Sequence, residues 1–364
     1  MTLSTDSDLK QALEAVVVPG FQHSLGRLGR LRQLPPEGDV LRFDAELGVP
    51  VGGVRDELHR ELQRVAESLG GGAAVEIKVG QKITSHGVQR NLKPLTEVRN
   101  VIAIASGKGG VGKSTTAVNL ALALAADGAA VGILDADIYG PSQPLMLGLT
   151  GQRPSSEDGK TMNPLLAHGL QVMSIGFLID PDQPMVWRGP MVTSALNQLL
   201  HQTRWQDLDY LIVDMPPGTG DIQLTLSQQV PVSGAVIVTT PQDIALLDAQ
   251  KGLQMFRKVS VSVLGIVENM SSHVCSNCGY EEALFGSGGG QRMAEKYGVA
   301  LLGQLPLDLS IREQTDSGTP TVVAAPESPQ AIAYRNVARN MAAALALQGK
   351  DYSRRFPNIV VEES

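Results

Sequence analysis

The sequence predicts an α/β protein with a doubly wound, mainly parallel sheet, preceded by a small α+β domain. Two observations support this class. From Val101 onward, short apolar runs alternate with segments of helical periodicity, which is the order that builds a parallel sheet covered by helices. Most of these runs are apolar without interruption, as expected for strands that are buried on both faces.

The length and composition of the chain agree with this architecture. About two domains are expected for 364 residues, and a hydrophobic fraction of 43% is ample for packed cores. The formal net charge of −7 argues against a nucleic-acid-binding protein. No apolar run is long enough to cross a bilayer, and the first residues do not resemble a signal peptide. We therefore expect a cytoplasmic protein that binds neither nucleic acid nor membranes.

Residues 1–80 are predicted to form the small α+β domain. Helical spacing of apolar residues indicates helices near 9–16 and 54–69, and alternation indicates strands at 41–47 and 75–79. Between the first helix and the first strand, leucines recur every third residue and fit neither period; they are Leu25, Leu28, Leu31 and Leu34. If this stretch is a strand, the order is α-β-β-α-β. The nearby arginines form either a partner-binding patch or, the favoured interpretation, a solvated face; they are Arg27, Arg30 and Arg32.

The rest of the chain divides into a linker at 81–99, a large domain at 100–348 and a polar tail at 349–364. The strands expected in the large domain are 101–105, 130–135, 171–175, 210–214, 234–239, 262–267 and 300–304. The helices expected there are 114–127, 190–202, 243–258, 289–297 and 328–346.

A glycine-rich loop lies between the first strand and the first helix of the large domain. It matches the phosphate-loop pattern G-x-x-x-x-G-K-[ST] completely, which predicts a P-loop NTPase. Glycines let backbone N–H groups converge on phosphate oxygens, and the helix N-terminus adds partial positive charge. Lys113 is expected to reach the terminal phosphates and the Ser114 hydroxyl to bind Mg²⁺. The alternative is a Gly-rich turn that only connects the strand to the helix. The residues expected to contact the nucleotide here are Gly107, Lys108, Gly109, Gly110, Val111, Gly112, Lys113, Ser114 and Thr115.

The loop contains a second lysine, Lys108, directly after its first glycine. This pattern resembles the deviant Walker A motif of the MinD/ParA/ArsA/nitrogenase-iron-protein group. In that group the extra lysine crosses a dimer interface and contacts the partner's nucleotide. The resemblance therefore implies a homodimer that hydrolyses a nucleotide, with Lys108 acting in trans beside the catalytic Lys113.

Two of the predicted strands end in aspartates, at the edge where ligands gather in open α/β sheets. Asp135 and Asp137 follow the second strand, and Asp214 ends a later apolar run. The same resemblance makes Asp137 the catalytic residue that orients the attacking water, with Asp135 in support. Asp214 is expected to hold Mg²⁺ through a water molecule. The alternative for each is an aspartate that caps a turn or a helix.

Two further stretches complete the predicted nucleotide site. The Gly-rich loop at 216–221 follows Asp214 directly, where a segment that changes conformation on nucleotide hydrolysis would lie. The alternative is a simple connection between a strand and a helix. Asn269 ends another strand, and the resemblance suggests that it contacts adenine, because a side-chain amide both donates and accepts. The Asn-Lys-x-Asp pattern of GTPases is absent, since Met270 follows Asn269. The expectation of ATP rather than GTP comes mostly from the resemblance.

The only two cysteines, Cys275 and Cys278, form a C-x-x-C motif. Two thiolates at this spacing reach one metal centre, but tetrahedral zinc and iron–sulfur clusters usually have four protein ligands. A symmetric dimer would bring two such pairs together. The spacing also leaves open a thiol–disulfide switch or a structural zinc shared between subunits. His273 is interpreted as a solvated loop side chain and not as a ligand.

Taken in order, six stretches resemble the Mrp/ApbC-type P-loop ATPases, which carry or scaffold iron–sulfur clusters. Residues 1–80 resemble the small iron–sulfur-assembly domain often fused ahead of them, although this version has no cysteine. The resemblance implies a homodimeric ATPase that binds ATP, Mg²⁺ and a [4Fe–4S] cluster, the cluster through Cys275 and Cys278 of both subunits. Apo iron–sulfur proteins would receive the cluster. The six stretches are 107–115, 135–142, 187–190, 214–221, 268–271 and 275–278.

Two alternative functions remain to be compared. One is a positioning or partitioning ATPase whose C-x-x-C motif holds a structural zinc. The acidic composition disfavours the basic DNA-binding surface of such proteins, and Pro357 interrupts the tail where a membrane helix would lie. The other is a nitrogenase-like reductase. The cluster cysteines of that family are widely separated, whereas only Ser276 and Asn277 lie between them here.

Overall fold

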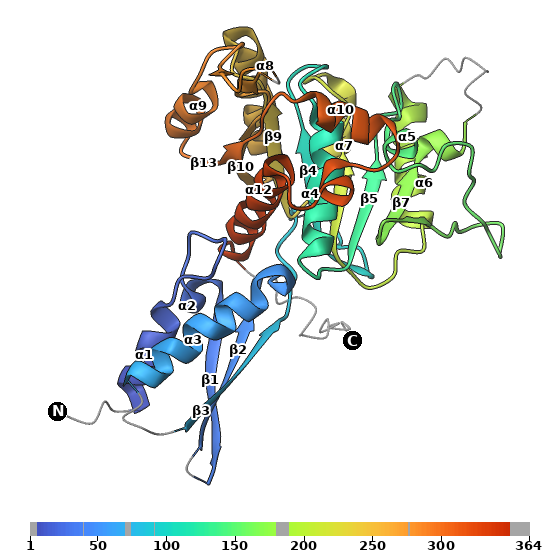
Figure 1. Cartoon of the computed structure of the whole chain (residues 1–364). Helices are drawn as coiled ribbons and strands as arrows, with labels where there is room; N and C mark the ends of the chain where they lie inside the picture. The colour runs from blue at the N-terminus through green and yellow to red at the C-terminus, as the bar shows by residue number, and fades with distance from the viewer. Residues whose placement is uncertain are drawn as a thin grey trace.

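The structure, a computed structural model, describes residues 6–38, 40–69, 74–90, 92–179, 189–275 and 277–349. Its strands form a three-stranded sheet near the N-terminus, an eight-stranded sheet in the remainder of the chain and a two-stranded hairpin (Figure 1). The predicted fold class is therefore confirmed. The predicted tail lies almost entirely outside the described residues.

The N-terminal unit has the predicted order with one added turn of helix. Helix α3 buries Leu58, Leu62 and Ala66 along one face, at the spacing that the sequence indicated. Strand β2 pairs antiparallel with β1 and parallel with β3. The ambiguous leucine stretch is a short helix that leads directly into a strand. The elements are α1 (Asp6–Ala15), α2 (Leu25–Leu28), β1 (Gly29–Glu37), β2 (Val40–Leu47), α3 (Arg55–Leu69) and β3 (Ala74–Gln81).

Two of the three arginines that formed the candidate patch are paired within this sheet. Arg30 lies 2.5 Å from a carboxylate oxygen of Glu46, and Arg32 lies 3.4 Å from the other oxygen. Partial burial alone would raise the pKa of Glu46, but the neighbouring guanidinium groups hold this pKa below its usual value. The shared Glu46 carboxylate offsets part of the positive charge, and both arginine side chains are about half exposed, at 55% and 48%, which supports a solvated face.

The eight-stranded sheet has the order β13-β10-β9-β4-β8-β5-β7-β6, and all neighbours are parallel except β6 and β7. Its strands are β4 (Val98–Ala105), β5 (Val131–Asp135), β6 (Leu165–Ala167), β7 (Leu170–Ser174), β8 (Leu208–Asp214), β9 (Gly234–Thr239), β10 (Val263–Glu268) and β13 (Ala300–Gln304). The predicted strands are each confirmed to within a few residues; the short antiparallel edge strand β6 was not predicted.

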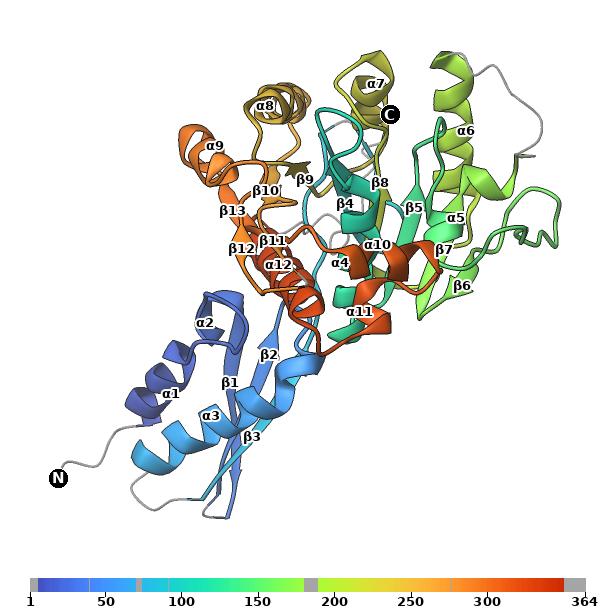
Figure 2. The ribbon, with the colours of Figure 1, turned by 45° about the horizontal axis from the view of Figure 1, so that its top comes forward.

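Helices cover both faces of this sheet, with α6, α7, α8 and α9 on one side and α4, α10, α11 and α12 on the other (Figure 2). Helix α4 is buried almost all round, which explains why its sequence is so rich in alanine and leucine. The helices are α4 (Lys113–Ala126), α5 (Gln143–Met146), α6 (Gly189–Gln202), α7 (Asp221–Gln229), α8 (Asp243–Lys258), α9 (Gly289–Tyr297), α10 (Leu309–Asp316), α11 (Thr321–Ala324) and α12 (Pro329–Ala346). Within the part of the chain that the structure describes, no helix has the length and apolar character needed to cross a membrane.

The predicted linker is shorter than expected, because β3 extends to Gln81 and β4 begins at Val98. The segment between them is held against the large sheet by buried side chains. His86 lies 2.9 Å from the side-chain oxygen of Asn100. Gln89 donates to the carbonyl groups of Ser227 and Val230 and accepts from the N–H of Val232. These contacts fix the path of the chain between the two sheets.

The N-terminal unit contacts the C-terminal end of α4. The Gly52 N–H donates to the carbonyl of Asp127 at 2.7 Å, and Gln81 donates to the carbonyl of Gly128 at 2.7 Å. At the same point, the Arg339 guanidinium of α12 makes two hydrogen bonds to the Asp127 carboxylate, at 2.7 and 2.9 Å. Both side chains of this ion pair are nearly buried, with exposed fractions of 12% and 4%.

Replacing Arg339 by leucine is expected to lower the free energy of unfolding by about 3 kcal/mol, because the Asp127 carboxylate would stay buried without its partner. Urea unfolding measures this loss. Arg312→Leu is the matched control, since that arginine pairs with Asp316 on the surface and should contribute less than about 0.5 kcal/mol. Equal losses in the two variants would contradict a stabilising role for the buried pair.

Candidate functional site

The phosphate loop connects β4 to α4 and depends on glycine at two points. Gly112 has a φ of +80°, and an ideal Cβ there would lie 2.2 Å from the side-chain nitrogen of Asn269. A Cβ on Gly107 would lie 2.1 Å from the backbone carbonyl carbon of Asp248 in α8. Any larger residue would displace the loop, so these glycines are required by the close packing around it.

Lys113 is the centre of a group of acids at the carboxyl ends of β5 and β8. Its ammonium forms a short ion pair with the fully buried Asp214. It also lies 3.1 Å from the Ser114 hydroxyl oxygen and 3.9 Å from a carboxylate oxygen of Asp137. The exposed fraction of the Lys113 side chain is only 6%. The structure thus brings together the lysine, hydroxyl and carboxylates that the sequence analysis selected from three separate motifs.

Asp135 is held by hydrogen bonds from four groups. The backbone N–H groups of Asp137, Ser142 and Gln143 donate to its carboxylate at 3.0 to 3.1 Å, as does the Ser174 hydroxyl at 3.1 Å. Complete burial, and then the charge of Asp214, raise the pKa of Asp135 to about 7 despite these donors. The carboxylate therefore orders the loop that follows β5, which supports the secondary role predicted for it.

Asp137 lies at the edge of the same group, and its side chain is 12% exposed. Burial raises the pKa of Asp137, while the charge of Lys113 opposes this shift. One lysine thus faces three carboxyl groups. Negative charge in excess beside a hydroxyl is an arrangement that suits a hard divalent cation, so Ser114 and Asp214 fit the Mg²⁺ that the phosphate loop implies.

The other predicted residues support the loop in different ways. Asn269 donates from its side chain to the Val111 carbonyl at 2.9 Å, so in this structure its amide braces the loop, and an adenine contact stays a prediction. The Lys108 carbonyl accepts from the Ser106 hydroxyl at 2.9 Å. The ammonium of Lys108 forms no ion pair with any residue that the structure describes. The Gly218 N–H donates to the Ser106 carbonyl at 3.0 Å, which ties the loop after Asp214 to the phosphate loop.

The sequence analysis missed Gln143, the first residue of α5. Its side-chain nitrogen donates to the Asp214 carboxylate at 2.9 Å and to the Ser114 carbonyl at 3.2 Å. The sequence offered one sign of this role, because Gln143 is a polar residue in the irregular stretch that follows the strand-end Asp135. It did not stand out, because the helix that contains it has only four residues.

The two cysteines lie at the tip of the hairpin formed by β11 (His273–Val274) and β12 (Glu281–Glu282). The backbone of Cys275 accepts from the Gly279 N–H at 2.8 Å and donates to the Tyr280 carbonyl at 2.9 Å, which closes the turn. Both thiols are free, and Cys278 is exposed. The N–H groups of Cys278 and Asn277 point at the Cys275 sulfur and lower its pKa. Hydrogen bonds of this kind also stabilise metal-bound thiolates.

His273 is not simply solvated, which corrects the interpretation made from the sequence. Its Nδ1 lies 3.0 Å from the Leu307 carbonyl, so the ring is anchored to the chain that follows β13. Among the described residues, no group of three or more histidine, cysteine, aspartate or glutamate side chains is arranged to hold a metal ion. A complete four-ligand centre at the hairpin therefore needs donors beyond those that one described chain supplies.

The comparisons with known proteins agree with this geometry. The family described as ParA, NUBPL iron-transfer P-loop NTPase, matches residues 97–342 of the chain. The chain belongs to this family of P-loop NTPases. It is 53% identical over 332 residues to the iron-sulfur cluster carrier protein of Escherichia coli K12, covering 91% of this chain and 90% of that protein. It is 55% identical over 259 residues to the iron-sulfur cluster transfer protein NUBPL of Mus musculus, covering 71% and 81%.

Solved structures that resemble this chain also have the P-loop NTPase fold. A nucleotide-binding protein from Archaeoglobus fulgidus, in complex with ADP, is 38% identical and has a TM-score of 0.57 over 65% of this chain and 91% of that chain. The cell division ATPase MinD of Pyrococcus furiosus is 25% identical, with a TM-score of 0.51 over 66% and 97%. The predicted family and fold are confirmed, and membership of an ATPase-like NTPase family supports nucleotide hydrolysis in general.

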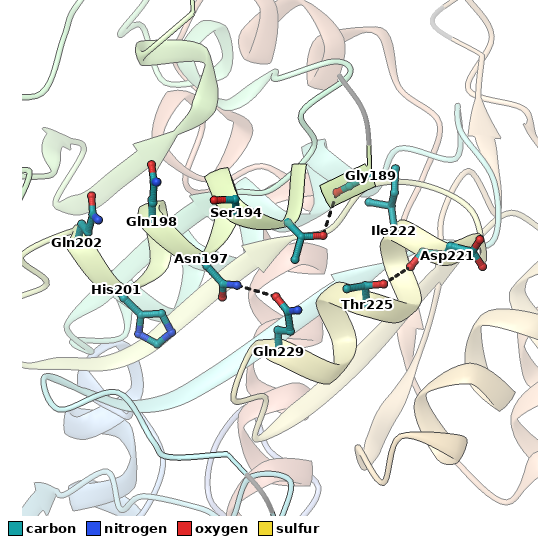
Figure 3. Close-up of a pocket in the computed structure, with 11 residues that line it drawn as sticks. Gly189, Ser194, Asn197, Gln198, His201, Gln202, Asp221, Ile222, Thr225 and Gln229 are labelled. Atoms are coloured by element: carbon teal, nitrogen blue, oxygen red, sulfur yellow. Dashed lines mark hydrogen bonds between the residues drawn. The ribbon is translucent and has the colours of Figure 1, made fainter. Parts of the chain in front are cut away.

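A cavity of about 890 Å³ lies between α6 and α7, and none of the predicted phosphate-loop, catalytic or cysteine residues is among the described residues that line it (Figure 3). Several of its polar side chains are already paired. Asn197 donates to Gln229 at 2.6 Å, and the hydroxyl groups of Thr193 and Thr225 donate to backbone carbonyls of their own helices. Among its described lining residues, Asp221 is the one that adjoins the nucleotide site, since it begins α7 directly after the Gly-rich loop. The lysine, hydroxyl and acids described above lie at the phosphate loop and are not among the described residues that line this cavity.

Proposed function

We propose that this chain is a cytoplasmic, ATP-dependent carrier that binds an iron–sulfur cluster and transfers it to apo-proteins. The observation that carries the proposal is the exposed hairpin with two free thiols, one of them with a lowered pKa, on a P-loop NTPase. Relatives that are about half identical to this chain are named as cluster carriers and support the same role. The alternative of a positioning ATPase with a structural zinc gains no support from these relatives.

ATP is the proposed nucleotide, and the roles of the site residues follow from their positions. The backbone N–H groups of the phosphate loop and Lys113 would bind the phosphates, which draws the lysine away from Asp214. Ser114 and Asp214 would then hold Mg²⁺, which neutralises charge on the phosphates when it is bound. Asp137 would orient the attacking water from the partly open edge of the site. Asp135 would keep the loop that contains Asp137 in place.

A homodimer is the proposed working form. Each chain supplies two thiolates, so a second copy completes four ligands for a cluster at a two-fold interface. The hairpin and the residues directly after it carry exposed apolar side chains, which are suited to burial against a second chain. These side chains are Val274, Tyr280 and Leu284. The ammonium of Lys108, which has no ion pair with a described residue, fits the trans role that the deviant Walker A motif implies.

Replacing Lys108 by alanine tests the dimeric mechanism. ATP hydrolysis is expected to fall by roughly 10³- to 10⁵-fold, the scale at which a cation supplied in trans contributes to phosphoryl transfer. Equilibrium binding of a fluorescent ATP analogue should change by less than about threefold, because each nucleotide is bound mainly by the phosphate loop and Lys113 of its own chain. Lys251→Ala is the control, since that lysine pairs with Asp248 on the surface. Hydrolysis equal to wild type would contradict the trans role.

Transfer itself is tested by incubating the reconstituted protein with an apo-ferredoxin and following the visible circular dichroism of the product. Cluster should appear on the ferredoxin at a rate that depends on ATP and Mg²⁺. A rate equal to that of free iron and sulfide, with or without nucleotide, would contradict the carrier function.

A further inference from the structure

Gln143 contacts all three parts of the proposed nucleotide site. It is fully buried at the start of α5. Its backbone N–H donates to the Asp135 carboxylate at 3.1 Å. Its side-chain nitrogen donates to Asp214 at 2.9 Å and to the Ser114 carbonyl at 3.2 Å. One residue thus joins the ends of β5 and β8 to the first turn of α4.

The hydrogen-bond acceptors around Gln143 determine the orientation of its side-chain amide. With Nε2 toward the Asp214 carboxylate and the Ser114 carbonyl, both of its protons have acceptors. The reverse orientation would place Oε1 against two oxygens that cannot donate. In the favoured orientation Oε1 is buried and has no hydrogen-bond partner among the described residues, and the same holds for the Ser142 hydroxyl beside it. Buried polar atoms normally have partners, and these two belong to residues whose N–H groups bond Asp135 at the nucleotide site, where a bound ligand or its water can supply one.

The two oxygens of Asp214 have different partners. Lys113 pairs with Oδ1, and Gln143 donates to Oδ2. When a nucleotide draws Lys113 to its phosphates, the bond to Gln143 is the contact that still fixes the rotation of the carboxylate. The anchor is rigid, because the backbone of Gln143 is itself bonded to Asp135.

We propose that Gln143 is a positioning residue for the metal of the nucleotide site. It holds Asp214 so that Oδ1 faces the hydration shell of Mg²⁺ once Lys113 has turned to the phosphates. This inference rests on the proposed function, since it requires a Mg²⁺–nucleotide complex at the phosphate loop. Groups that orient a metal-binding side chain commonly change metal affinity by about 10- to 100-fold.

The test is Gln143→Met, which keeps the length of the side chain and the backbone bond to Asp135 but removes both side-chain donors. Binding of a fluorescent ADP analogue is measured in EDTA and across a Mg²⁺ titration. The Mg²⁺ concentration at half-saturation should rise about tenfold, while affinity in EDTA changes less than about threefold. A residue with only a structural role would change both equally.

Gln223→Met is the matched control. Gln223 is also buried, and neither of its side-chain polar atoms has a partner among the described residues, so its loss should leave the Mg²⁺ titration unchanged. If the methionine variant folds poorly, Gln143→Asn takes its place. This variant shortens the side chain by one methylene group and withdraws the amide from Asp214, so the same rise in the Mg²⁺ concentration at half-saturation is expected.

The outcomes separate the inference from the proposed function. If wild type binds the nucleotide in a Mg²⁺-dependent way and the Gln143 variants titrate like it, the positioning role is overturned alone. An equal loss of affinity in EDTA and in Mg²⁺ also overturns it. If wild type shows no Mg²⁺-dependent nucleotide binding, the proposed function fails first and the inference falls with it.

Discussion

Replacing both Cys275 and Cys278 by alanine is expected to abolish cluster binding. After anaerobic reconstitution with iron and sulfide, wild type should hold about four of each per dimer, and the double variant only background amounts. The reason is that these are the only thiols of the chain, so no other side chain can supply a thiolate ligand. Iron and sulfide assays, together with the visible absorption of the cluster, measure the loss.

The control for this experiment is Asn277→Ala, which alters the same turn but keeps both thiols and the backbone N–H that points at Cys275. Its cluster content should match wild type. ATP binding by the double cysteine variant should also stay within about twofold, because no hydrogen bond joins the described residues of the hairpin to the phosphate loop. A variant without either cysteine that still retained iron and sulfide would contradict the assignment, and loss of nucleotide binding would show that the cysteines serve the fold.

Replacing Lys113 by alanine is the second change with a large expected effect. Nucleotide affinity and turnover should each fall at least about 100-fold, because the lysine is the main positive charge available for the phosphates. The same change leaves the fully buried Asp214 without its positively charged partner, so the free energy of unfolding should fall by about 3 kcal/mol. Isothermal titration with ATP, phosphate release and urea unfolding measure the three quantities.

Lys251→Ala again provides the comparison, since its exposed pair should leave all three quantities near wild type. A Lys113 variant with normal ATP affinity would show that the buried lysine serves only to neutralise Asp214. A normal unfolding free energy would show instead that the carboxylate relaxes without cost.

Patterns set by burial could be predicted from the sequence. The strands of the large sheet and α4 were recognised because both are enclosed by other elements and therefore read as continuous apolar runs. The phosphate loop and the strand-end aspartates were found because their spacing and context carry a chemical meaning. Their convergence on Lys113 follows from the parallel sheet, whose carboxyl ends meet at one edge.

Features set by tertiary contact could not be predicted in this way. In helix α7, one threonine, one serine and three glutamines among nine residues weaken the apolar period, and α5 is too short to show one. The leucines every third residue from Leu25 were ambiguous because they run from a helical turn into a strand. The roles of Gln143 and His273 depend on partners far along the chain, a carboxylate in one case and a carbonyl in the other.

The central claim is that two chains share one cluster through their cysteine hairpins. Native mass spectrometry of the anaerobically reconstituted protein tests it most directly. The account predicts a species with the mass of two chains, four irons and four sulfides, which is absent from the double cysteine variant. A dimer that carries zinc without sulfide, or a cluster bound to a single chain, would contradict it.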